Sequence, residues 1–390
     1  MRVALLGLLI TVGLIKPTAS ASPAKETGAL APLPTMVPGP ELGLKPTSGY
    51  ARGYRPPRAN VGHLSVRNQL ARPQLAQPLP SRWDWRDQAA VTGVRNQGEC
   101  GSCYAFAGLG SLEAQLLIRG AGLYDFSENN IAECSYEPAG CEGGNIWIVA
   151  NRLSSYGAVA ESCDPYNPAT QPCKTTCPPI KMVDEVWILG DSSVPDTTLL
   201  KTWLYRYGPL YVTMDSGSTS PTWDQEFAQY KGRYTLYHPD IIKLDHAVLL
   251  VGWDDNLIHA GGSGAWIVKN SWGVNWGAGG YFTMAYGSAG LGSNPALIAG
   301  WHEPKSAERL LFLDEGGWQR EYGWMSQLGA WGMVRLIPSQ SGCIDQVELW
   351  TTDRTRQVDV YLYDSFDGQA PSGLLRQLPR QAFEFPGYHK

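Results

Sequence analysis

The sequence predicts an α+β protein, because helix-forming stretches come early in its folded part and strand-forming stretches come late. Apolar residues at roughly helical spacing follow Cys103, and apolar runs typical of strands gather beyond Gly208-Pro209. After a boundary near Trp301, alternating apolar and polar residues indicate further half-buried strands. We therefore expect two lobes, followed by an all-β region.

The first 21 residues have the layout of a secretory signal peptide. Arg2 precedes an apolar run over residues 3–15, and a small-x-small cleavage site follows at residues 19–21. The run is shorter than the ~20 apolar residues that a spanning helix needs. We therefore predict a secreted protein with no membrane span after removal of the signal. Export favours disulfides among the eight cysteines.

Residues 22–79 are rich in proline and carry seven Lys or Arg against two Glu, whereas the remainder of the chain is acidic. A disordered linker is one interpretation of this segment. Its position before the folded part, which begins near Pro80, instead favours a propeptide, the protein's own intramolecular partner. The net charge of −5 argues against nucleic acid as a partner.

Three helices are predicted in the first lobe. One begins at Cys103 and ends near Gly120, the second has Ser127 as its N-cap, and the third runs over residues 145–156. The predicted strands of the second lobe cover residues 210–214, 247–251, 266–269 and 281–284.

Cys100 and Cys103 form a Cys-x-x-Cys pair at the start of the first helix. A metal-binding pair, a redox pair and two ordinary disulfide cysteines are the alternatives. A helix N-terminus stabilises a thiolate, so we interpret Cys103 as a nucleophile. His246 stands at the head of a strand and Asn270 at the end of another, positions where both residue types are usually structural.

Together these stretches resemble the papain family of cysteine peptidases. The Gln97–Tyr104 stretch, Asp245-His246-Ala247 and Lys269-Asn270-Ser271-Trp272 follow the family's order of Cys, His and Asn. Further matches in that order extend from about residue 80 to 301. The resemblance implies a two-lobed papain-like fold, with a helical lobe and a β-barrel-like lobe, over residues 80–304. An enlarged surface loop is expected between Trp253 and Trp266.

The resemblance also implies the roles of individual residues. Cys103 would attack the peptide carbonyl as a thiolate, and His246 would protonate the leaving amine. Asn270 would hold the His246 ring beneath Trp272, and the Gln97 side chain would help to form the oxyanion hole. No metal or other cofactor is expected.

Substrates would be proteins or peptides, bound in extended form along a ledge and a mainly apolar side-chain pocket. The implied binding residues are Gly143, Gly144, Asn145, Ile146, Leu244, Ala247 and Trp272. The loop over residues 162–179 lacks the histidines of a cathepsin-B-like occluding loop, which favours endopeptidase activity.

The family pattern pairs Cys100 with Cys141 and Cys134 with Cys173. A third, local pair is expected between Cys163 and Cys177, which leaves Cys343 over.

Residues 305–390 resemble the lectin-like domain that follows papain-type domains in some bacterial and archaeal secreted proteins, so glycans are a candidate partner. The tail stops at Lys390, before a complete sandwich is expected, so the domain is either small or truncated. Two alternative functions stay open at this point, a catalytically inactive papain-like homologue and a carbohydrate-binding adhesive protein.

Overall fold

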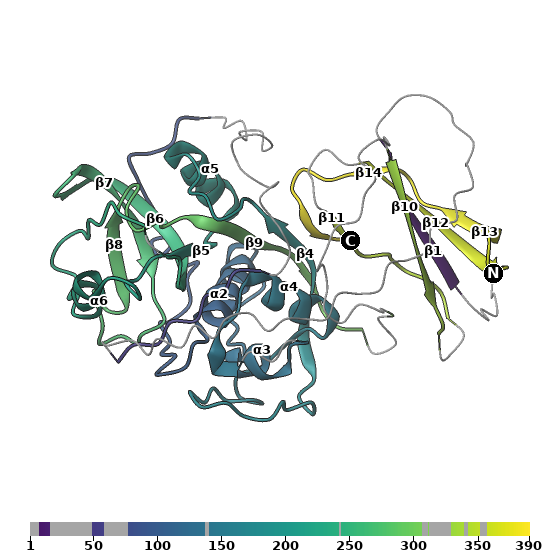
Figure 1. Cartoon of the computed structure of the whole chain (residues 1–390), viewed down its shortest axis with the longest axis horizontal. Helices are drawn as coiled ribbons and strands as arrows, with labels where there is room; N and C mark the ends of the chain where they lie inside the picture. Colours follow the sequence, from purple (N-terminus) through teal and green to yellow (C-terminus); the bar gives the residue numbers. More distant parts are fainter. Residues whose placement is uncertain are drawn as a thin grey trace.

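A computed structural model describes residues 8–15, 49–57, 77–136, 140–241, 243–305, 311, 329–338, 342–351 and 357–390. In this part of the chain the helices precede most of the strands, and the α+β class predicted from the sequence is confirmed (Figure 1). Most of the predicted propeptide lies outside the described residues, which include only its residues 49–57 and 77–79.

Helix α2 (Cys103–Ile118) lies at the centre of the two-lobed body, with strands on one side and shorter helices on the other (Figure 1). It is buried over 14 residues, because apolar and small side chains occur all around it rather than on one face. Helices α3 (Glu128–Cys134) and α4 (Ile146–Ser155) begin at the caps Ser127 and Asn145, whose side-chain oxygens accept backbone N–H bonds.

Two further helices and several strands were not anticipated. The helices are α5 (Thr197–Tyr207), capped by Asp196, and α6 (Pro221–Ala228), capped by Ser220. The strands are β2 (Arg82–Asp84), β3 (Ala158–Val159), β4 (Pro179–Ile188) and β9 (Ser293–His302).

A ten-stranded sheet forms the second lobe and continues past it. Its four predicted strands are present as β5 (Leu210–Met214), β6 (His246–His259), β7 (Gly262–Lys269) and β8 (Tyr281–Ala285). Antiparallel pairing of Leu249 with Lys269 brings the start of β6 beside the end of β7. This register places His246 next to Asn270.

The enlarged loop expected between Trp253 and Trp266 is instead a long hairpin, so that prediction was wrong. Strand β6 runs on to His259 and returns as β7, with Ile258 paired to Ser263 and His259 to Gly262. The glycines that suggested a loop serve the turn, where Gly262 has a φ of +134°.

The described strands of the C-terminal region contribute to two sheets. Strands β10 (Gly329–Leu336), β12 (Gln357–Phe366), β13 (Pro371–Gln377) and β14 (Gln381–Ala382) belong to a distinct five-stranded sheet. In contrast, β11 (Leu349–Thr351) and β15 (Gly387–His389) extend the ten-stranded sheet, since β15 pairs with the edge of β4. Phe385 and Tyr388 belong to the two main hydrophobic cores.

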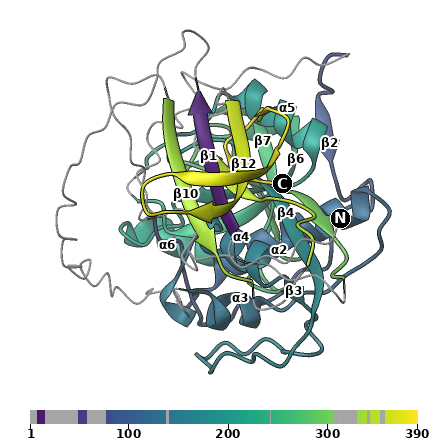
Figure 2. The same cartoon turned by 90° about the vertical axis from the view of Figure 1, so that its right-hand side faces the viewer.

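Strand β1 (Leu8–Ile15) is the fifth member of the distinct sheet and lies between β10 and β12 (Figure 2). These residues are the apolar run of the predicted signal peptide. Cleavage after residue 21 would remove β1, and the facing edges of β10 and β12 would lose their partner. The signal peptide stays a prediction. If it is cleaved, the processed chain lacks β1.

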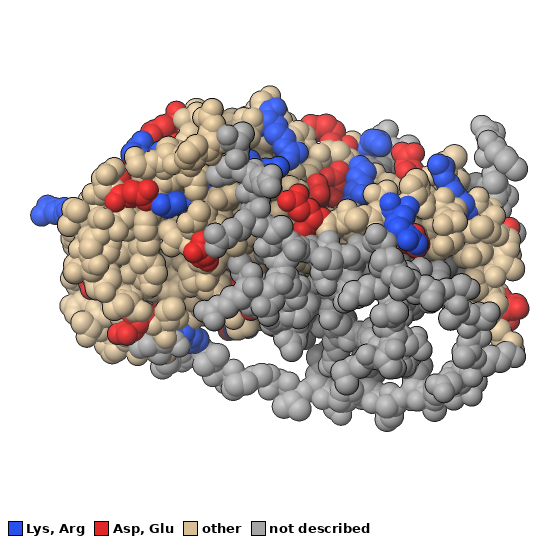
Figure 3. Space-filling view, turned by 90° about the horizontal axis from the view of Figure 1, so that it is seen from above, with Lys and Arg blue, Asp and Glu red and all other residues tan. Residues whose placement is uncertain are grey.

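Among the described residues, no helix combines the length and the apolar character needed to cross a membrane. On the face seen in Figure 3, acidic and basic side chains lie close to one another instead of separating into large patches of one sign.

Candidate active site

Cys103 is the first residue of α2 and is fully buried in the interface between the two lobes. Its Sγ accepts a hydrogen bond from the backbone N–H of Ala247 at 3.4 Å, and Ala247 follows His246 on β6. The helix N-terminus and this N–H both favour negative charge on the sulfur. Helix α2 and strand β6 thus hold Cys103 beside the histidine strand.

His246 and Asn270 are in direct contact. The Nε2 of His246 lies 2.8 Å from the Oδ1 of Asn270, which also accepts the backbone N–H of Ser271 at 2.9 Å. The Trp272 ring covers the imidazole at a centroid distance of 5.0 Å. The other ring nitrogen, Nδ1, is buried and has no hydrogen-bond partner among the described residues. Nδ1 is therefore the nitrogen available to exchange a proton with a neighbouring group.

The Gln97 side chain is fixed from both ends. Its Oε1 accepts the hydroxyl of Ser271 at 2.5 Å, and its Nε2 donates to the carbonyl of Cys100 at 2.8 Å. The same Nε2 donates to the carbonyl oxygen of Ala51 at 3.2 Å. A carbonyl oxygen from another segment thus occupies the position where Gln97 would receive an oxyanion.

That segment, residues 49–57, lies across the site and covers it. Gly53 donates a backbone hydrogen bond to the Cys103 sulfur and sits against Gly101, where a side chain at position 53 would meet the Gly101 oxygen at 1.7 Å. Tyr50 stacks on Trp272 at a centroid distance of 4.6 Å. Only glycine allows this close approach to Cys103.

The glycine ledge pairs with the covering segment. Gly144 donates to the Gly53 carbonyl at 2.7 Å and accepts from the Arg55 N–H at 2.9 Å. Gly143 has a φ of +104°, and a Cβ there would meet the Gly53 oxygen at 2.6 Å. Asn145 donates to the Arg55 carbonyl at 3.1 Å. These three predicted binding residues all contact the segment.

Tyr54 lies beside the predicted side-chain pocket. Its N–H donates to the backbone carbonyl of Asp245, the residue after the half-buried Leu244, at 2.9 Å. Its buried hydroxyl is hydrogen-bonded to Asn294, and burial raises its pKa. Tyr211, near Tyr54, shares a buried cluster with the two remaining predicted pocket residues, Ile146 and Ala247.

Burial under the segment shifts both reacting groups toward their neutral forms. Removal from water raises the pKa of the Cys103 thiol to about 12 and lowers the pKa of His246 to about 4. The hydrogen bonds from Ala247 and Asn270 oppose these shifts. The covered site therefore favours a thiol and a neutral imidazole rather than an ion pair.

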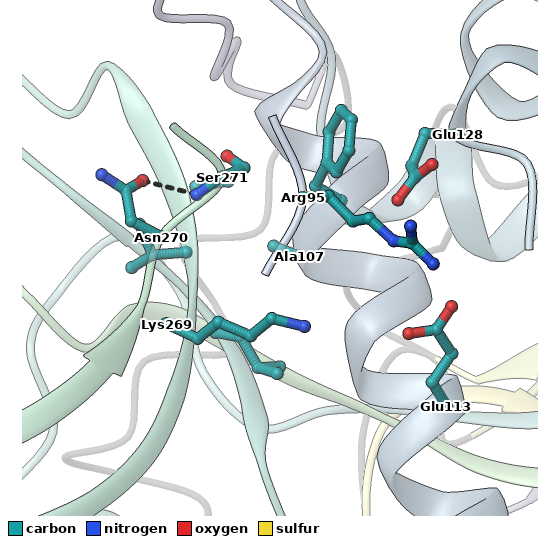
Figure 4. A pocket seen from close by; sticks show the side chains of 11 residues that line it. Arg95, Ala107, Glu113, Glu128, Lys269, Asn270 and Ser271 are labelled. Atoms are coloured by element: carbon teal, nitrogen blue, oxygen red, sulfur yellow. Dashed lines mark hydrogen bonds between the residues drawn. The ribbon is translucent and has the colours of Figure 1, made fainter. Parts of the chain in front are cut away.

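Behind Cys103 and Asn270, a small cavity lies between α2 and the end of β7 (Figure 4). Thr92 links the lobes there, because it donates to Glu113 at 2.5 Å and accepts from Lys269 at 3.1 Å. Burial raises the pKa values of Glu113 and Glu128 and lowers that of Lys269. This polar contact connects the helix that carries Cys103 with the strand that precedes Asn270.

Three disulfides surround the helical lobe. They join Cys100 to Cys141, Cys134 to Cys173 and Cys163 to Cys177, the pairs expected from the sequence. Cys103 is a buried free thiol, and Cys343 is an exposed one. Cys100 is therefore held in a disulfide, whereas Cys103 has a free thiol.

Several residues of the site were missed in the sequence. Ser271 could have been noticed, since it lies inside the Asn-Ser-Trp stretch, but its contact with Gln97 spans 174 positions. Arg52, Tyr54, Asp224 and Asn294 belong to no motif, and only the folded chain brings them together.

Comparison with known proteins agrees with this geometry. The sequence pattern of the family described as "Papain family cysteine protease" matches residues 79–299. The chain is 34% identical over 209 residues to a viral cathepsin of Heliothis zea nuclear polyhedrosis virus, which covers 53% of this chain and 52% of the relative. It is 32% identical over 238 residues to procathepsin L of Rattus norvegicus, with 60% and 66% covered.

Among solved structures, the digestive procathepsin L2 proteinase from Tenebrio molitor larval midgut superposes with a TM-score of 0.54 and 27% identity. It covers 66% of this chain and 80% of that one. Overall, the chain spans about half to two thirds of the length of these two curated relatives. The match over residues 79–299 includes Cys103, His246 and Asn270, and the chain belongs to the papain family of cysteine proteases.

Proposed function

We propose that the protein is a secreted cysteine endopeptidase, made as a zymogen, that hydrolyses peptide bonds through Cys103 and His246. The observation that carries the proposal is a peptide segment of the chain lying across Cys103, with a carbonyl oxygen on the Gln97 amide. A groove that holds an extended peptide by its backbone at a free thiol is suited to peptide-bond cleavage.

The chemistry follows from the geometry. After the segment leaves, water reaches the site, and the proton of Cys103 passes to Nδ1 of His246. The thiolate attacks the carbonyl carbon, while the Gln97 amide and the Cys103 N–H stabilise the oxyanion. The C–N bond breaks as His246 protonates the amine. Water then attacks the carbonyl carbon of the thioester and gives a proton to His246. The C–S bond breaks and releases the acid, and His246 returns the proton to the Cys103 sulfur.

The chain direction of residues 49–57 supports the proposal that the protein is made as an inactive zymogen. Tyr54 pairs with Gly144 in parallel, and the chain runs from Trp272 across Cys103 toward the ledge. A substrate with its acyl part on the ledge and its amine beside His246 would run the opposite way. The segment therefore presents its peptide bonds with reversed polarity and covers the nucleophile without offering it a leaving amine.

Secretion and endopeptidase activity rest on separate features. Three disulfides are typical of proteins from oxidising compartments, in agreement with the predicted signal peptide. The loop over residues 162–179 contains no histidine for a substrate's terminal carboxylate. The inactive-homologue alternative leaves the combination of Gln97, Cys103, His246 and Asn270 without a role. Glycan binding by residues 305–390 stays a prediction.

Substitution of the nucleophile tests the proposal. We expect the full-length chain cleaved ahead of Pro80 to hydrolyse an unfolded protein, and Cys103→Ala to lose this activity. Cys343→Ala is the matched control, because that free cysteine is exposed and lies outside the site. Equal hydrolysis by wild type and Cys103→Ala would show that Cys103 is not the nucleophile.

A further inference from the structure

The guanidinium of Arg52 is buried in an acidic pocket beside the catalytic residues. Its Nε donates to the Ser216 hydroxyl at 2.7 Å, and an Nη donates to the Ser216 carbonyl at 3.0 Å. That Nη also pairs with Asp224, and Nε lies 3.7 Å from Asp245. The side chains of Arg52, Asp224 and Asp245 are at most 5% exposed.

The pocket is built by the peptidase itself. Asp245 accepts hydrogen bonds from the Ser216 N–H and hydroxyl, at 2.8 and 2.7 Å, and from the Ser218 N–H at 2.8 Å. Gly217, with a φ of +108°, lets this loop approach α6 so closely that a Cβ would meet the Asp224 nitrogen at 2.4 Å. The loop therefore donates three hydrogen bonds to the Asp245 carboxylate, and Asp224 makes the closer of the two ion pairs with Arg52.

The pocket lies on the leaving-group side of the nucleophile. Arg52 immediately precedes Gly53, which sits on Cys103, whereas Tyr54 lies on the ledge side. Asp245 immediately precedes His246, the group that would protonate the leaving amine. A substrate residue whose side chain enters the Arg52 position therefore belongs to the amine half of the cleaved bond.

Burial makes such a pocket selective. A guanidinium or ammonium group enters at acceptable cost only opposite a carboxylate with which it forms hydrogen bonds. An apolar guest would lose the ion pair that Arg52 makes with Asp224, and an acidic guest would add like-charge repulsion.

We infer that the pocket formed by Ser216, Asp224 and Asp245 takes an Arg or Lys side chain of the substrate residue that follows the cleaved bond, and that Asp224 sets this preference. The inference rests on the proposed peptidase function. The covering segment uses the same pocket, with Arg52 in the place of the substrate's basic residue.

Cleavage of matched peptides tests the pocket in catalysis. The full-length chain cleaved ahead of Pro80 is given peptides that differ only in the residue after the cleaved bond, which is Arg, Lys, Leu or Glu. We expect kcat/KM for Arg to exceed that for Leu by about 10-fold or more. Asp224→Asn should bring this ratio close to one with the Leu peptide still cleaved, and Asp224→Glu should restore part of it.

Glu226→Gln is the matched control, because it removes the same charge from an exposed position on the same helix. A ratio unchanged by Asp224→Asn, or lowered equally by Glu226→Gln, would overturn the inference while hydrolysis itself still supports the proposed function.

A binding measurement tests the pocket without catalysis. Synthetic peptide 49–57 and its Arg52→Leu version are titrated into the same cleaved protein carrying Cys103→Ala. We expect the Arg52→Leu peptide to bind about 10-fold more weakly or worse, and Asp224→Asn to abolish most of that difference. Equal affinities in the presence of Asp224 would contradict the inference even if the protein hydrolysed no peptide.

Discussion

Gln97 shows how a single side chain is fixed in the position that the proposed mechanism needs. Ser271 holds its oxygen and the Cys100 carbonyl holds its nitrogen, so that the amide points at one place near Cys103. The Ala51 carbonyl already lies there. A donor fixed before the reaction stabilises an oxyanion without reorganisation, which is the main benefit of such a group.

We predict that Gln97→Ala lowers kcat by roughly 10²- to 10³-fold with a much smaller effect on KM, because the donor acts chiefly on the transition state. Steady-state kinetics with a peptide substrate would check this. A variant that changed only KM would show that Gln97 binds the ground state instead.

The buried carboxyl of Glu128 makes the stability of the fold depend on pH. Burial raises its pKa well above 4.5, and the nearby Glu113 adds to the shift. Above pH 4.5 the unfolded chain therefore loses a proton that the folded chain keeps, and stability falls as pH rises through this range.

Glu128→Gln removes this titration. We expect the variant to gain stability over wild type, and the gain in the free energy of unfolding to be larger at about pH 8 than at about pH 5. Thermal unfolding at both pH values would measure it, with the exposed Glu142→Gln as the control. A gain that is equal at both pH values would contradict the assignment of a raised pKa.

The elements of the site were predictable where a local signal marks them. Ser127 and Asn145 cap α3 and α4 as expected, and Cys103 begins α2. Helices α5 and α6 were missed although Asp196 and Ser220 offer the same type of cap. Short helices with mixed polarity give weak periodicity, so packing rather than propensity decides them.

Segment 49–57 could not be predicted as an element, because it has no regular periodicity and its contacts come from distant parts of the chain. Its position depends on Gly53. We predict that Gly53→Leu in the full-length chain makes Cys103 reactive toward a thiol reagent without cleavage of the chain, because the side chain would collide with Gly101.

Arg55→Ala is the control for that experiment, because its ion pair with Glu142 is exposed and contributes little. Protection of Cys103 that survives Gly53→Leu would mean that something other than this segment covers the thiol.

At the scale of the whole molecule, the end of the tail joins the papain-like body, whereas β10, β12, β13 and β14 belong to the distinct sheet. Strand β15 pairs with β4, Pro386 accepts the Ile188 N–H at 2.8 Å, and Phe385 is only 1% exposed in the core of the second lobe. The pairing of β15 with β4 could not be predicted from the sequence, because strand pairing across about 200 positions leaves no local pattern. The domain over residues 305–390 stays a prediction.

We predict that Phe385→Ala lowers the stability of the peptidase by about 3–5 kcal/mol, the usual cost of removing a buried phenylalanine. Thermal unfolding followed by loss of peptidase activity would report it. Phe366→Ala, at a position that is 38% exposed on β12, should change the midpoint temperature of unfolding little. Equal effects of the two substitutions would mean that the tail does not support the peptidase core.

The central claim is that Cys103 is a catalytic thiol covered by residues 49–57. Its most direct test is labelling with an epoxide inhibitor directed at papain-type thiols, followed by mass spectrometry of the peptide that contains Cys103. We predict stoichiometric modification of Cys103, with complete loss of peptide hydrolysis, in the chain cleaved ahead of Pro80, and protection of Cys103 in the uncleaved chain. Hydrolysis that continues after Cys103 is fully modified, or equal labelling before and after cleavage, would contradict the account.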